Sequence, residues 1–202
     1  IYAAGDQLFA SDCCGFASAT GYYAGRKAAS YASKTILKSV DTNQIEKEKE
    51  RLYAPMKVEK GIHWKELNMA ISKAMQIYCG GIKNKDLLNE GIKLLKDFQE
   101  EIVPNISCSN PHELMRTHEV LDILTVSELI INACILRESS SRPLCFYRSD
   151  FTEVDPESDK KFITIKNENG NIIKRIIPLD YYGDLKSNYE INNKDYIGGA
   201  SL

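Results

Sequence analysis

Hydrophobic residues in the middle of the chain recur every three or four positions, the spacing of amphipathic helices. The pattern predicts three helices, over residues 63–79, 87–102 and 112–137. Pro104 ends the second helix, and Pro111 opens the third at its first position. The last two thirds of the third helix are apolar nearly all round, so we expect it to be the central and most buried helix of a bundle.

The two ends of the chain follow other patterns. Residues 1–5 form a short apolar segment that ends in glycine, as a buried parallel strand does. The next helix, over about 15–40, carries small residues on one face: Ala17, Gly21, Ala24, Ala28 and Ala32. Alternation on both sides of Asn169-Gly170 predicts a β-hairpin, and the polar tail after it is expected to be extended.

These elements predict a mainly α fold: a helical domain over 41–160, followed by a β-hairpin and extended tail over 161–202. Residues 1–40 do not belong to that domain by pattern. A lone parallel strand leaves its N–H and C=O groups unpaired, so we interpret 1–40 as the last strand, loop and helix of a nucleotide-binding sheet. Away from that sheet it is expected to pack differently or to self-associate through residues 1–40.

Composition excludes several classes of protein. The chain has 202 residues, 43% of them hydrophobic and 27% charged, with a net charge of −2, as in soluble globular proteins. No basic surface for nucleic acid is indicated. No apolar run approaches the roughly 20 residues of a membrane span, so we expect a cytoplasmic protein.

The cysteines do not have the spacing of a metal site. There are six: Cys13, Cys14, Cys79, Cys108, Cys134 and Cys145. None forms a C-x-x-C pair, so no metal is expected, and the thiols are interpreted as reduced and mostly buried. The adjacent pair Cys13-Cys14 lies beside a predicted helix N-terminus.

The first 20 residues carry the candidate chemistry. The segment A-A-G-D places Asp6 at the carboxyl edge of a sheet, where open α/β folds bind cofactors. The following helix begins around Gly15 to Ser18 with unpaired N–H groups. A flavin site needs an acid that binds sugar or ribityl hydroxyls. It also needs a helix N-terminus that points at a carbonyl of the ring. An ordinary strand-turn-helix corner without a ligand remains the alternative.

The segments IYAAGD and GFASATGYYAGRKAA resemble the second flavin-binding signature of the succinate dehydrogenase and fumarate reductase flavoprotein family. The segment HWKELNMAISKAMQIYCGGIKNKDLLNEGIKLLKDF is similar to that family's C-terminal helical domain, and LMRTHEVLDILTVSELIINACILRESSSRPLCFYRSDFTEVD to its last long helix and the charged segment after it. The resemblance runs from residue 1 to about 165.

The resemblance implies FAD as the cofactor of the intact protein. Asp6 then takes the place of the acid on the ribityl chain, Ala17 and Ser18 approach the isoalloxazine ring through their backbone amides, and Gly15 allows close contact. The charged segment of the family maps onto Arg142, Tyr147, Arg148 and Asp150. For the arginines an ion pair with Glu138 or Asp150 is favoured over a catalytic function.

Two departures bear on the substrate. The family's Asn-Arg-x-Gly-Gly turn, whose arginine binds a substrate carboxylate, is replaced by SDCCG with Asp12 near the arginine position. An acid there repels a dicarboxylate. The Gly-x-His of the later segment is replaced by Pro143-Leu144-Cys145. The short loop and GFAS turn are more similar to the adenylylsulfate reductase branch.

The sequence therefore supports two hypotheses. The first is the C-terminal portion of an FAD-dependent oxidoreductase, inactive alone, because the G-x-G-x-x-G unit and capping domain are not in these residues. Its partners are then the upstream FAD and capping domain of the same protein and an iron-sulfur electron-transfer protein. The second is a non-catalytic helical module, or a separate subunit, that docks onto a flavin domain or an iron-sulfur partner.

Overall fold

A computed structural model describes the chain except residues 8–12, 37–38, 156, 169–170, 179–182 and 193–202. The chain forms two compact units, Ile1–Glu48 and Lys49–Leu202, which are described separately. The division into 1–40, 41–160 and 161–202 stays a prediction. None of the helices in the described ranges is long and apolar enough to cross a membrane.

The first unit consists of a turn and helices. A 3₁₀ turn at Gly5–Gln7 precedes α1 (Cys13–Ala32), and α2 (Thr42–Tyr53) begins in this unit. The strand expected over residues 1–5 is absent: residues 1–4 have no regular secondary structure, and Ile1 is exposed. A parallel strand forms only beside a neighbour, and no strand pairs with these residues in the described chain.

The second unit is built on the three predicted helices, which the structure confirms. They are α3 (Trp64–Tyr78), α4 (Lys85–Asp97) with a π-helical turn at Phe98–Ile102, and α5 (Pro111–Leu136). Each N-terminus has a side-chain cap: His63, Asn84 and Asn110 accept hydrogen bonds from backbone N–H groups of the first turns. The capping residues explain why the helices begin within a residue or two of their expected positions.

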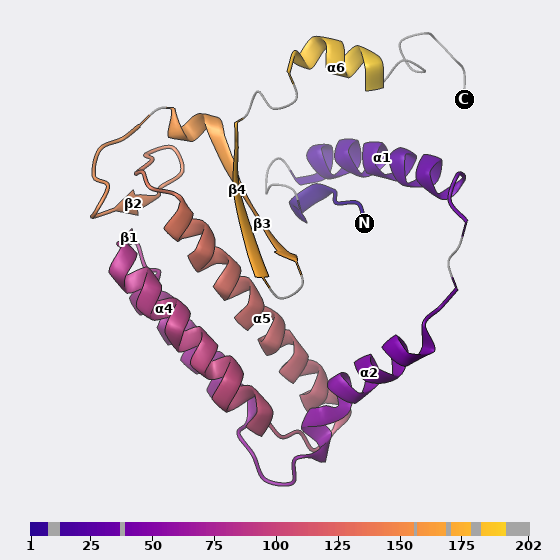
Figure 1. The fold of residues 1–202 in the computed structure, drawn as a ribbon, viewed down its shortest axis with the longest axis vertical. Helices are drawn as coiled ribbons and strands as arrows, with labels where there is room; N and C mark the ends of the chain where they lie inside the picture. The colour runs from indigo at the N-terminus through magenta and orange to yellow at the C-terminus, as the bar shows by residue number, and fades with distance from the viewer. Residues whose placement is uncertain (8–12, 37–38, 156, 169–170, 179–182, 193–202) are drawn as a thin grey trace. The chain divides into compact units, whose positions relative to one another are not determined.

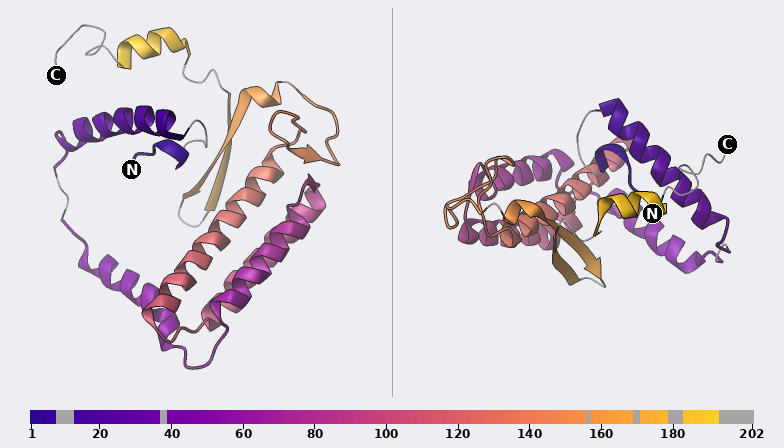
Figure 2. Two further views of the ribbon diagram at one scale, coloured as in Figure 1. Left: turned by 180° about the vertical axis from the view of Figure 1, so that it is seen from behind. Right: turned by 90° about the horizontal axis from the view of Figure 1, so that it is seen from above.

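The core of the second unit lies between α3, α4 and α5. Figure 1 shows α4 and α5 side by side, and the views of Figure 2 agree. Gly91 permits this approach, because a Cβ there would lie 2.8 Å from the Cβ of Tyr78 and 3.1 Å from Cδ1 of Ile131. The best buried apolar side chains are Leu67, Ile71, Leu88, Leu95, Ile106 and Ile131.

Helix α5 has one apolar face that the described residues leave open. Ile123, Val126 and Ile130 are 45%, 51% and 43% exposed, while Leu124 and Ile131 are buried against α3 and α4. The expectation that α5 is the central and most buried helix agrees with its contacts to α3, α4 and β3 and with its buried residues, which outnumber those of α3 and of α4. These three exposed residues are the exception. Helices α3 and α4 and strand β3 contact α5 elsewhere, and the patch of Ile123, Val126 and Ile130 is left exposed.

Short β elements complete the second unit. β1 (Ile82–Lys83) pairs in parallel with β2 (Tyr147–Arg148). β3 (Lys161–Glu168) and β4 (Asn171–Pro178) pair antiparallel, which confirms the predicted hairpin. Its central Asn169-Gly170 lies outside the described residues. The tail departs from the extended conformation expected for it, because Leu185–Asn192 forms helix α6.

Candidate functional site

The candidate flavin-binding residues all lie in the first unit. Asp6 follows Gly5 in the 3₁₀ turn, and Gly15, Ala17 and Ser18 lie in the first two turns of α1. Gly5 has φ +59°, and its N–H donates to Oγ1 of Thr20 over 2.9 Å. A Cβ on Gly5 would lie 3.5 Å from the Cβ of Ala17. The structure thus brings the turn that carries Asp6 against the start of α1.

This corner has the donors and acceptors that a flavin requires. Asp6, Gly15, Ala17 and Ser18 are all exposed. The Asp6 carboxylate has no hydrogen bond to any described residue, so it is free to accept from ribityl hydroxyls. A Cβ at Gly15 would meet nothing within 4 Å, which leaves room for a planar ring beside the first-turn N–H groups. An exposed carboxylate and an open first helical turn are groups that the ribityl and pyrimidine portions of FAD would need, and the function of these residues in cofactor binding stays a prediction. Asp12 lies outside the described residues.

A second candidate centre surrounds Arg148, whose side chain is 0% exposed. Its Nε and Nη2 donate to the two Asp150 carboxylate oxygens at 2.8 and 2.6 Å. Its Nη1 donates to the carbonyls of Cys134 and Arg137 at 2.7 and 2.9 Å. Those carbonyls lie at the C-terminal end of α5, where helix carbonyls lack intrahelical partners. The ion pair expected for this arginine is confirmed, with Asp150 as its partner.

Asp150 connects this centre to a second helix. Its Oδ2 accepts the backbone N–H of Lys85, the first residue of α4, at 2.8 Å. The guanidinium of Arg148 is the main reason why the pKa of Asp150 is lowered from 3.8 to about 2. One ion pair therefore caps the C-terminus of α5 through Arg148 and the N-terminus of α4 through Asp150, with charges that suit both helix dipoles.

The loop between α5 and β2 encloses the Arg148 centre. The Ser140 hydroxyl donates to the Phe151 carbonyl at 2.6 Å and accepts the Arg148 N–H at 3.0 Å. Cys145 has φ +50°, an unusual value for a residue with a side chain. Arg142 and Tyr147 are exposed on the rim of an open hollow of about 480 Å³. Because Arg148 is saturated by protein partners, we assign it to structure rather than substrate binding.

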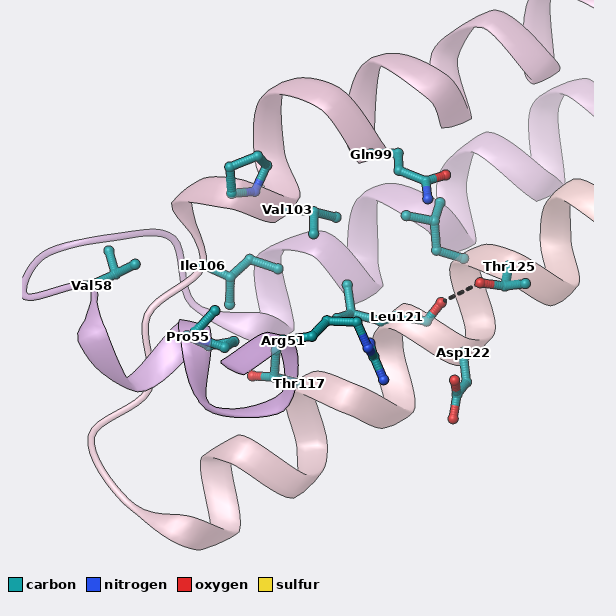
Figure 3. A pocket seen from close by; sticks show the side chains of 13 residues that line it. Arg51, Pro55, Val58, Gln99, Val103, Ile106, Thr117, Leu121, Asp122 and Thr125 are labelled. Carbon is teal, nitrogen blue, oxygen red and sulfur yellow. Dashed lines mark hydrogen bonds between the residues drawn. The ribbon is translucent and has the colours of Figure 1, made fainter. Parts of the chain in front are cut away.

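A further cavity, of about 390 Å³, lies between the end of α2 and the middle of α5 (Figure 3). Apolar groups such as Pro55, Val103 and Leu121 form much of its wall, and Arg51 and Asp122 add polar groups. None of the residues predicted to form a site lines it. Sequence reasoning missed it because its lining residues are spread over more than 70 positions.

No metal centre is found among the described residues, where no three His, Cys, Asp or Glu side chains converge. His118 instead makes a hydrogen bond within the fold, its Nε2 donating to the carbonyl oxygen of Leu52 at 2.8 Å. His63 caps α3. These histidines therefore have structural functions within the second unit.

Comparison with known proteins decides the family. The family model for the fumarate reductase flavoprotein C-terminus matches residues 68–180, more than half of the chain. The chain belongs to this family. In this flavoprotein C-terminal domain, the matched range contains α4, α5 and the Arg148 centre, whereas Asp6, Gly15, Ala17 and Ser18 lie before it.

The relatives are much longer than this flavoprotein domain. A curated relative, adenylylsulfate reductase subunit alpha of Megalodesulfovibrio gigas, is 28% identical over 58% of this chain and 18% of its own length. A structure of E. coli quinol fumarate reductase FrdA has a TM-score of 0.68 at 19% identity, covering 81% of this chain and 29% of that one. The Mycobacterium smegmatis Sdh1 complex gives 0.64 at 16%, covering 77% and 27%. The chain thus spans less than a third of each.

Proposed function

We propose that this chain is the C-terminal portion of an FAD-dependent oxidoreductase of the succinate dehydrogenase and fumarate reductase type, and that it is catalytically inactive alone. The observation that carries the proposal is the corner at Gly5, Asp6 and Ala17 in a chain of this family. FAD, when bound, supplies transfer of a hydride or an electron pair. The upstream FAD and capping domain of the same protein would supply the remaining cofactor and substrate contacts.

The residues of the first unit would hold one side of the cofactor. The exposed carboxylate of Asp6 would accept hydrogen bonds from ribityl hydroxyls, and the unpaired N–H groups of the first turn of α1, which includes Gly15, would face the pyrimidine edge of the ring. The N–H groups of Ala17 and Ser18 lie within α1, so these two residues would line the site without donating to the ring. The N-terminal end of α1 carries partial positive charge, which stabilises negative charge on that edge. Gly15 keeps the approach free of a side chain.

For the substrate, we favour one of the adenylylsulfate reductase type over a dicarboxylate. The similarity to the Megalodesulfovibrio gigas protein supports this choice, and so does Asp12, whose charge opposes a substrate carboxylate. An iron-sulfur protein is the expected electron-transfer partner. Residues 1–40 are also expected to support self-association.

Reconstitution of the flavin site tests the proposal. The chain is mixed with the separately produced upstream flavin domain, and bound flavin is measured by its visible absorbance after gel filtration. We expect a yellow complex and no reductase activity from the chain alone with added FAD. Reductase activity of the chain alone, or a colourless complex of two folded parts, would contradict the proposal.

A matched pair of variants tests Asp6 itself. Asp6→Asn removes the negative charge of an acceptor for ribityl hydroxyls, so we expect flavin retention to weaken about 10-fold or more, the equivalent of about 1.5 kcal/mol. Asp41→Asn is the control, because Asp41 is also exposed and caps α2 through its Oδ1, a task that Asn performs equally well. Equal flavin retention in both variants would remove Asp6 from the site.

The open apolar face of α5 supports the second candidate function, a non-catalytic module that docks onto a flavin domain or an iron-sulfur protein. Ile123, Val126 and Ile130 are the residues that such docking would bury. The reconstitution separates the two functions. A stable complex that retains no flavin, with both parts folded, would favour the docking module.

A further inference from the structure

Two cysteines that are 55 positions apart in sequence meet in the second unit. Cys79 is the C-terminal cap of α3, and Cys134 lies in the last turn of α5. Their sulfur atoms are 3.7 Å apart, with Cys79 donating to Cys134. Cys134 is 8% exposed, whereas Cys79 is partly accessible to solvent. The pair therefore combines one thiol that a reagent can reach with a second thiol held against it.

The surroundings of the pair favour the thiolate of Cys79. When Cys79 loses its proton, Cys134 becomes the donor of the hydrogen bond between the two sulfurs. This bond and the charge of Lys83 lower the pKa of Cys79 from 9.0 to about 7, against the opposing effect of burial. The Lys83 ammonium is held in place by the Gly80 carbonyl at 2.8 Å. The same hydrogen bond and burial raise the pKa of Cys134, and Lys83 and Arg148 partly oppose that rise. Cys79 is therefore the thiolate that attacks, and Cys134 is the neutral second thiol.

We propose that Cys79 and Cys134 form a dithiol site that low-molecular-weight disulfides convert into an intramolecular disulfide. The sulfurs must approach from 3.7 Å to a bond length of about 2.05 Å, which side-chain rotation and a small shift at the end of α3 can supply. The bond would join the end of α3 to the end of α5, beside the Cys134 carbonyl that Arg148 binds.

The exchange balances in two steps. The Cys79 thiolate attacks one sulfur of the disulfide RSSR, forms a mixed disulfide and releases RS⁻. The Cys134 thiol then loses its proton and attacks the Cys79 sulfur, which releases the second RS⁻. Both leaving groups are recovered as RSH at neutral pH, so RSSR is reduced by two electrons and the two protein thiols are oxidised to one disulfide.

Oxidised glutathione is a suitable probe with the full chain. The protein is reduced, freed of reductant, exposed to oxidised glutathione, blocked with N-ethylmaleimide and digested with trypsin. Each cysteine of the pair is alone on its peptide, AMQIYCGGIK or THEVLDILTVSELIINACILR. We expect these two peptides to be cross-linked. At pH 7, the lowered pKa of Cys79 predicts a faster reaction than that of an equally accessible thiol with an ordinary pKa.

Two variants distinguish this site from general thiol oxidation. In Cys134→Ser the second step is lost, so Cys79 is expected to keep a stable mixed disulfide with glutathione. Cys108→Ser is the matched control, because Cys108 is buried beside the Thr117 hydroxyl and not beside a sulfur, and it should leave the cross-link unchanged. The wild-type peptide map decides the question even if Cys134→Ser does not fold.

Three results would overturn the proposal. The first is glutathione remaining on Cys79 in the folded wild-type chain without the cross-link. The second is no modification of Cys79 at all. The third is a cross-link yield no higher in the folded chain than in the chain unfolded in urea, since only the folded chain holds Cys79 against Cys134.

Discussion

Asp150→Asn tests whether one ion pair holds the ends of two helices. The substitution keeps the shape of the side chain and removes its charge. Arg148, whose side chain is 0% exposed, then retains the carbonyls of Cys134 and Arg137 as acceptors but has no counterion. The cap on the N–H of Lys85 is also weakened, because a neutral amide oxygen accepts less strongly than a carboxylate.

The magnitude follows from burial. Breaking a buried ion pair by removing one partner typically costs about 3–5 kcal/mol, because the remaining charge stays desolvated. The Asp150 side chain is itself 28% exposed, so water replaces part of the interaction that is lost. We therefore expect the free energy of unfolding of the second unit to fall by about 2–4 kcal/mol.

Urea unfolding followed by Trp64 fluorescence measures this change, because the chain has one tryptophan and it packs against the core of the second unit. With a slope of about 2 kcal/mol/M, the midpoint should fall by about 1–2 M. Glu157→Gln is the control: its ion pair with Lys160 is also 2.6 Å long, but both side chains are about two-thirds exposed. If both variants have the same midpoint, Asp150 does not hold the guanidinium as argued.

Other predictions use the same assay. Because the pKa of Asp150 is lowered to about 2, its contribution is complete above the unfolded value of 3.8; as pH falls from 3.8 to about 2, the wild-type and Asp150→Asn midpoints should converge. Gly91→Ala should destabilise by about 1–3 kcal/mol, since its Cβ would meet atoms at 2.8 and 3.1 Å; Gly25→Ala, in open space on α1, should raise helicity measured by circular dichroism. Ile131→Ala should cost about 2–5 kcal/mol and its exposed neighbour Ile130→Ala less than about 1 kcal/mol; equal losses would show that α5 does not face the core through Ile131.

Local sequence signals predicted the helices of the second unit well. The range 63–79 became α3 (Trp64–Tyr78) and 112–137 became α5 (Pro111–Leu136), because periodicity and capping residues act within a few positions. The hairpin could be predicted equally well, since alternation of apolar and polar residues on both sides of Asn169-Gly170 sets its register. Local patterns failed for residues 1–5, because a strand depends on a neighbour that local sequence does not supply.

The candidate site could be predicted from the sequence only in part. Asp6 and the start of α1 were predicted from an acid at the end of an apolar segment and from family resemblance, and their cofactor function stays a prediction. The pair of Cys79 and Cys134 was missed, because no pattern in either helix indicates that the two ends meet. The sequence drew attention to Cys13-Cys14 instead, since adjacency in the chain is the only proximity it displays.

Arg148 combines a feature that the sequence predicts with one that it does not. Its partner Asp150 is two positions away, so the ion pair was predictable as one of two choices. The burial of Arg148 was not predictable. It depends on the carbonyls of Cys134 and Arg137 and on the N–H of Lys85, which binds Asp150 from 65 positions away. A surface arginine and this one have the same local sequence signature. Only the meeting of two helix ends, each with unpaired backbone groups, turns the pair into a centre that positions α4 against α5.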